Sequence, residues 1–190
     1  ETKDDPDLSL SAPFPIKKDS FYRKIFRDLT GITGYKRYSQ ALNSILNTEA
    51  KNSKEKLNKV WHKIHGFLIT NTIIFFMISI FFHWSLFFLL WWLPAFTYYS
   101  LIIRIRNIAE HSVTPGNNNF DNTRTTLTNP LVRFLMAPHR VNYHLEHHLF
   151  MMCPWYNLPK AHSMMIENGY EDRMCIANSY RSVLMKAVSA

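Results

Sequence analysis

The chain has 190 residues, with 22 Lys and Arg against 14 Asp and Glu, a formal net charge of +8 and two cysteines. No zinc-finger spacing and no basic and aromatic RNA-binding pattern accompanies this charge, so we expect anionic lipid headgroups, and no nucleic acid, as partners. Two cysteines are too few for a disulfide framework, and we expect free thiols.

The first 63 residues mix basic and acidic side chains densely. An apolar pattern with helical spacing begins at Phe21, between basic residues, and predicts an amphipathic helix on a membrane surface. Gly31 and Gly34 are expected to interrupt it, and a second helix is expected over residues 36–47. Residues 1–63 are therefore predicted to form a cytoplasmic or interfacial helical segment.

Residues 66–103 contain no Asp, Glu, Lys or Arg. This stretch holds two apolar runs, 66–82 and 85–103, each close to the roughly 20 residues that span a bilayer core. It predicts a transmembrane helical hairpin within residues 64–106, with the second helix kinked at Pro94. The alternative is a buried hairpin of a soluble protein, although so long an uncharged stretch exceeds what a small core can cover.

Basic residues lie on both sides of the predicted hairpin. Five lysines lie between positions 51 and 63, and Arg104 and Arg106 follow the second run. Positively charged flanks stay on the cytoplasmic side of a membrane. We therefore expect a multi-pass integral membrane protein whose C-terminal region is cytoplasmic.

Residues 107–190 are predicted to be that cytoplasmic region, and to bind metal. A loop is expected over 114–129 and a short apolar segment over 131–136, before a histidine-rich segment and a soluble tail. The expected fold class is all-α, with interfacial and cytoplasmic helices around one transmembrane hairpin.

Three histidines lie within five residues: His144, His147 and His148. On a helix they would project from one arc of roughly 100 degrees. Such a face suits borderline transition metals such as iron, copper or zinc. The alternative is a solvated or membrane-surface patch of histidines.

A second group of polar residues lies at the end of the second apolar run. Asn107 and His111 are four residues apart, on the same side of a helix, and could face the histidine-rich segment. Glu110 and Glu146 each adjoin a candidate ligand and could accept a hydrogen bond from the distal N–H of a ligand. Glu110 could instead pair with Arg106.

The residues at 142–150, Asn-Tyr-His-Leu-Glu-His-His-Leu-Phe, resemble the third histidine box, HxxHH, of the membrane fatty acid desaturase family. Residues 106–111 resemble the segment before that box, and residues 158–162 resemble a Leu-Pro and His stretch that follows it. The resemblance covers essentially the whole chain. Only the box is strongly specific, and hydroxylases and ketolases share it.

The resemblance implies two non-haem iron ions that use O2 to introduce a double bond into a fatty acyl lipid or thioester. Electrons would come from a ferredoxin or a cytochrome-b-type carrier. The alternatives are a hydroxylase or ketolase of a carotenoid or other apolar lipid, and a membrane metal-binding protein without redox chemistry. The expected ligands are His111, His144, His147 and His148, with Asn107 as a weaker, water-mediated contributor. We expect His139 and His162 to face the surface.

The sequence departs from the family pattern before the hairpin. The first two histidine boxes are absent, and only His62 and His65 precede the hairpin. Four histidines are too few for two irons. We therefore expect a fragment of a longer polypeptide, inactive by itself.

Overall fold

The computed structural model describes residues 14–116, 118 and 120–188. Apart from one pair of two-residue strands, the regular elements in this part of the chain are helices, which confirms the predicted all-α class. The chain divides into two compact units. Residues 24–101 form the hairpin unit, and the described residues among 14–23 and 102–188 form the histidine unit. Residues 1–13 of the helical segment predicted over 1–63 lie outside the described residues.

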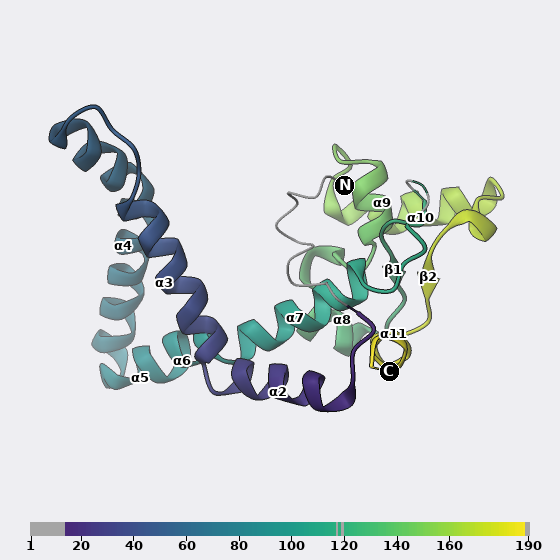
Figure 1. Ribbon diagram of the computed structural model, residues 1–190, viewed down its shortest axis with the longest axis horizontal. Coiled ribbons are helices and arrows are strands. Elements are labelled where there is room, and N and C mark those ends of the chain that lie inside the picture. The colour runs from purple at the N-terminus through teal and green to yellow at the C-terminus, as the bar shows by residue number, and fades with distance from the viewer. Residues whose placement is uncertain (1–13, 117, 119, 189–190) are drawn as a thin grey trace. The chain divides into compact units, whose positions relative to one another are not determined.

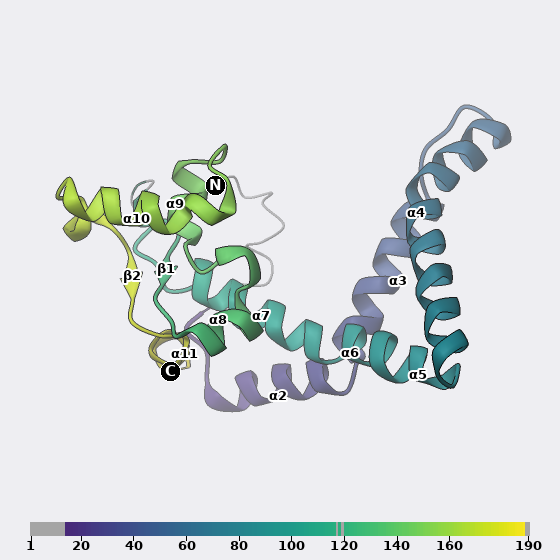
Figure 2. The ribbon, with the colours of Figure 1, turned by 180° about the vertical axis from the view of Figure 1, so that it is seen from behind.

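The hairpin unit contains the end of α2 (Lys18–Leu29), then α3 (Ile32–Leu46) and α4 (Ser53–Phe81). In both views α3 lies beside α4, and it also contacts α6 (Leu93–Phe96) (Figure 1, Figure 2). Gly31 separates α2 from α3 with a φ of 81°, a backbone conformation that glycine adopts without strain. The predicted interruption at Gly31 is therefore confirmed.

Gly34 does not interrupt a helix, and that prediction was wrong. It lies inside α3, where a Cβ atom would come within 2.2 Å of the Phe96 carbonyl oxygen. The glycine is present because the backbones of α3 and α6 approach each other closely, a long-range contact that the local pattern does not contain. Arg37 on α3 donates to the Ala95 carbonyl oxygen at 3.0 Å and reinforces this crossing.

Among the described residues, two helical stretches are long and apolar enough to cross a membrane: Ser53–Phe81 and Ser85–His111. The first begins well before the predicted position 66, and the Asn52 side chain caps it by accepting a hydrogen bond from the Glu55 N–H. Large apolar side chains such as Ile80 and Phe81 are exposed along it. Lipid is the environment that suits such a surface.

The second stretch is not one regular helix with a kink at Pro94. It runs through α5 (Ser85–Phe87), the π-helix η1 (Phe88–Trp92), α6 and α7 (Tyr98–His111). Pro94 lies in the first turn of α6, where its missing N–H is tolerated, and the break falls at Thr97, with φ −103° and ψ −86°. The irregularity therefore extends to both sides of the proline.

The histidine unit packs short elements around the end of α7. They are β1 (Thr125–Thr126), α8 (Pro130–Met136), η2 (Pro138–Arg140), α9 (His144–Leu149), η3 (Trp155–Asn157), α10 (Leu158–Glu167), η4 (Glu171–Arg173), β2 (Ile176–Ala177) and α11 (Tyr180–Ala187). The two strands pair in parallel, with Thr125 opposite Ile176. Thr125 also forms a bridge with Tyr143, immediately before α9. The short strand inside the predicted loop thus ties the start of α9 to β2.

Three small apolar clusters hold this unit together. Ile108 of α7 packs with Val183 and Ala187 of α11. Ala109, the next residue of α7, packs with Ala137 and Tyr180, and Leu145 of α9 packs with Met165 and Met174. α7 and α9 are therefore both anchored on buried side chains close to their histidines.

Candidate metal centre

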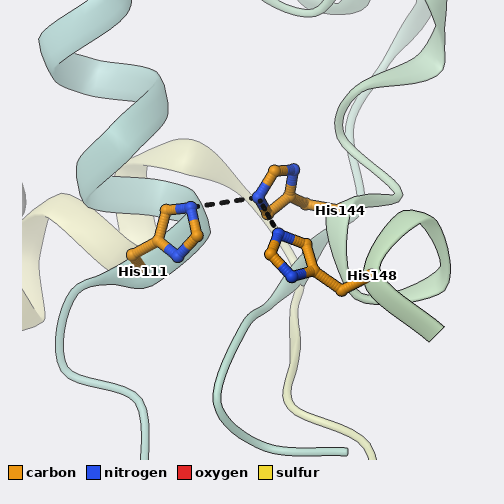
Figure 3. Close-up of side chains that lie close together, drawn as sticks. All are labelled: His111, His144 and His148. Carbon is orange, nitrogen blue, oxygen red and sulfur yellow. Dashed lines mark hydrogen bonds between the residues drawn. The ribbon is translucent and has the colours of Figure 1, made fainter. Parts of the chain in front are cut away.

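Three histidines from two helices converge in the histidine unit. Figure 3 shows His111, at the end of α7, facing His144 and His148, which lie one turn apart on α9. The Nε2 atom of His144 is 3.0 Å from the Nε2 atom of His111 and 3.0 Å from that of His148. One donor nitrogen from each of the three residues lies within 4.8 Å of the other two. We call these residues the histidine triad.

The triad has the donor set of a transition-metal site. Two imidazole nitrogens bonded to one ion at about 2.1 Å are separated by roughly 3.0–3.4 Å, and the two short separations in the triad fall in this range. Burial, followed by the positive charges of neighbouring His111, His148, His147 and Arg106, lowers the pKa of His144 from 6.5 to about 2. The neutral imidazole is the form that binds a metal, so the residues present fit an iron or a similar ion.

The low pKa of His144 predicts that the metal-free protein loses stability in acid. In the unfolded chain His144 titrates near 6.5, so between pH 6.5 and 2 only the unfolded state takes up this proton. The free energy of unfolding should therefore fall by about 2 kcal/mol between pH 7.5 and 5 because of this one group. Urea unfolding in neutral detergent would measure the slope. The His144→Gln variant should show a shallower slope, and equal slopes in both proteins would contradict the prediction.

The other two predicted ligands lie nearby but outside the triad. His147 is exposed, and its ring centroid is 5.9 Å from that of His144. Asn107 is buried on α7, one turn before His111. The arc expected for α9 therefore brings only His144 and His148 together with His111. The roles of His147 and Asn107 as ligands stay predictions.

Glu146 lies between the histidines of α9 and is completely buried. It accepts a hydrogen bond from the hydroxyl of Thr125, and its Oε1 is 2.6 Å from Nδ1 of His162. The expectation that His162 faces the surface was wrong, because its side chain is only 15% exposed. The sequence signal was its place in the stretch 158–162. Thr125 carried no signal, since only tertiary pairing brings β1 to α9.

Glu110 lies beside His111, and its Oε1 is 3.2 Å from Nε of Arg106 on the previous turn. Of the two arrangements expected for Glu110, the pairing with Arg106 is therefore present. Burial of Tyr180, together with the Glu110 charge, raises the pKa of that phenol. Whether Glu110 also orients a metal ligand stays a prediction.

Arg124 holds the end of the helix that carries His111. Its guanidinium donates to the carbonyl oxygens of Ala109, Ser112 and Val113 at 2.9–3.1 Å, and it is 4% exposed. Its backbone N–H donates to the Glu110 carbonyl at 2.9 Å. A cation at this position satisfies carbonyls that have no partner within the helix and interacts favourably with the helix dipole. Arg124 therefore helps to position His111 through the backbone on either side of it.

Replacing Arg124 with alanine should destabilise the histidine unit by roughly 3 kcal/mol, because three carbonyl groups lose a charged donor. Metal affinity should fall about tenfold as the end of α7 loosens, in line with the effect of other residues that orient ligands. The Arg124→Lys variant should keep only part of the stability and part of the metal affinity, because one ammonium group cannot reach all three carbonyl oxygens. Arg181→Ala, at an exposed position of α11, is the control. Urea unfolding and metal titration measure the two effects, and wild-type values for Arg124→Ala would contradict the assignment.

The family model described as fatty acid desaturase matches residues 1–176. That region includes all three residues of the triad as well as Glu146 and His162. Neither a search of curated proteins nor a search of solved structures returned a match. Because the family match extends over most of the chain and contains the histidine triad, the chain belongs to the fatty acid desaturase family.

Proposed function

We propose that this chain contributes the C-terminal histidine ligands of a di-iron centre that uses O2 to introduce a double bond into a lipid acyl chain. One observation carries the proposal: in a chain of the desaturase family, His111 of α7 meets His144 and His148 of α9. Among the described residues, the group of converging metal-binding side chains consists of imidazoles and includes no carboxylate. This distinguishes it from soluble carboxylate-bridged di-iron bundles.

The proposed ligands are the triad, His147, and Asn107 through a water molecule. When bound, two irons supply activation of dioxygen and removal of hydrogen from an unactivated methylene. Two ions need more imidazoles than these four histidines provide, so we expect further histidines from another polypeptide segment to complete the site. The 190-residue chain alone should therefore show no turnover.

The residues of the chain itself hold the ligands in place. Burial keeps His144 neutral at physiological pH, so that its nitrogen lone pair is available. Glu146, paired with His162 and Thr125, fixes the start of α9. Arg124 fixes the end of α7. Such preorganisation matters because the choice between desaturation and hydroxylation depends on placing the substrate within about an ångström.

The proposal extends to the surroundings of the site. The hairpin of residues 64–106 would span the membrane twice, and residues 1–63 and 107–190 would lie on its cytoplasmic side with the metal centre. The acyl substrate would come from membrane lipid or a thioester. Electrons would come from a ferredoxin or a cytochrome-b-type carrier.

Lipid analysis of a host that expresses the chain together with the segment supplying the remaining histidines would test the reaction. New double bonds in acyl chains are expected, and a His148→Ala variant should abolish them. New hydroxyl or keto groups would instead assign a hydroxylase or ketolase. Iron close to two per assembled protein is expected, whereas tight and exclusive zinc binding would contradict the oxidase.

A further inference from the structure

A second site lies outside the metal centre, where α8 ends and η2 begins. A cavity of about 490 Å³ there is lined by Arg133 and Phe134 of α8, by His139 and Arg140 of η2, and by Trp155 of η3. All of these residues belong to the histidine unit. Two arginines line the cavity and no acidic residue does. The cavity is therefore electropositive.

The two arginines have no counter-charge in the described part of the chain. Neither guanidinium forms an ion pair or a side-chain hydrogen bond with a described residue, although both residues are half-buried. This contrasts with Arg106 and Arg124 of the same unit, whose guanidiniums are bonded to Glu110 and to helix carbonyls. Unpaired guanidiniums that share one concavity attract an anion, and their planar donor forks match the oxygens of a phosphate.

The backbone of this turn is unusual. His139 and Arg140 are consecutive non-glycine residues with φ angles of 55° and 59°, in the left-handed region that costs free energy for such side chains. Strained positions of this kind cluster at ligand sites, where the surrounding structure maintains them. The His139 ring packs edge-on against the Trp155 ring, with 5.1 Å between the ring centroids. This contact holds the strained turn against the cavity wall.

Apolar side chains surround the charged cavity. Phe134 is 79% exposed on α8, with Leu131 and Leu135 on the same helix at 67% and 56%. Trp155 is half exposed on the other wall. A free phosphate would leave these side chains in water, whereas an amphiphile would cover them with its acyl chains while its headgroup meets the arginines. The chain belongs to a membrane-bound family, so the abundant anionic amphiphile around it is phospholipid.

We propose that this cavity binds the phosphate headgroup of an anionic phospholipid, with Arg133 and Arg140 as its ligands and the exposed face of α8 against the acyl chains. Contact with bilayer lipid at this position would dock the histidine unit on the membrane surface. The proposal uses none of the metal ligands and does not depend on the identity of the reaction.

Binding can be measured on the full chain purified in neutral detergent. The probes are short-chain phosphatidylglycerol, phosphatidylcholine with the same acyl chains, and inorganic phosphate, each titrated by calorimetry. The double variant R133Q/R140Q removes both cations. The matched control, K160Q/R181Q, removes two exposed cations of the same unit outside the cavity.

Wild-type protein and the control should bind phosphatidylglycerol at least tenfold more tightly than phosphatidylcholine, and R133Q/R140Q should lose this preference. A folded R133Q/R140Q protein, shown by an unchanged thermal midpoint, that keeps the preference would overturn the site. Equal binding of the two lipids by the wild type would overturn recognition of the anionic headgroup. Inorganic phosphate binding as tightly as phosphatidylglycerol would overturn the assignment to lipid.

Discussion

Replacing His144 with alanine should reduce metal binding by this chain at least about 100-fold, more than the loss of a residue that only orients a ligand. His144 is the central member of the triad, because its Nε2 is 3.0 Å from the Nε2 atoms of both His111 and His148. Without it, only His111 and His148 remain of the triad, with ring centroids 5.7 Å apart. Metal analysis of purified protein and titration with Fe²⁺ would measure the loss.

Two other histidines serve as comparisons for His144→Ala. His65 lies in α4, and its Nδ1 atom is 2.9 Å from the Trp61 carbonyl oxygen, so His65→Ala should leave affinity unchanged. The His147→Ala variant tests whether His147 is a ligand. A loss of metal affinity close to that of His144→Ala would show that His147 binds the metal, and a small loss would show that it is a surface residue. Wild-type metal content in His144→Ala would contradict the proposed centre.

Replacing Gly34 with alanine should destabilise the hairpin unit by about 3 kcal/mol, near the upper end of typical overpacking effects. The added Cβ would lie 2.2, 2.6 and 2.8 Å from the O, Cα and C atoms of Phe96. All three are backbone atoms and cannot rotate away, so α3 and α6 would have to separate. The separation would also weaken the bond from Arg37 to Ala95 and the packing of Tyr38 on Phe96, whose ring centroids are 5.0 Å apart.

Gly66→Ala is the matched control for Gly34→Ala. Gly66 lies inside α4, and a Cβ there would meet no atom within 4 Å. Alanine is the better helix former by roughly 0.5–1 kcal/mol, so this variant should be slightly more stable than the wild type. Thermal unfolding in detergent would compare the three proteins. A Gly34→Ala protein as stable as Gly66→Ala would show that the two helices do not touch as described.

The sequence by itself determined the features that depend on neighbouring residues. The uncharged run of residues 66–103 predicted two apolar helices, because lipid and side-chain hydropathy act on each segment separately. The spacing of His144 and His148 placed both on one face of α9, because helix geometry is local. The family also followed from a contiguous string of residues, and the match over residues 1–176 confirmed it.

Only the tertiary structure decided which side chains meet across the chain. His111 and His144 are 33 residues apart, and their contact depends on how α7 and α9 pack. The pairing of Glu146 with His162, the close approach at Gly34 and the strained turn at His139 depend likewise on distant partners. Periodicity shows which face a residue occupies, but not what that face contacts, because packing follows from the summed fit of many distant surfaces.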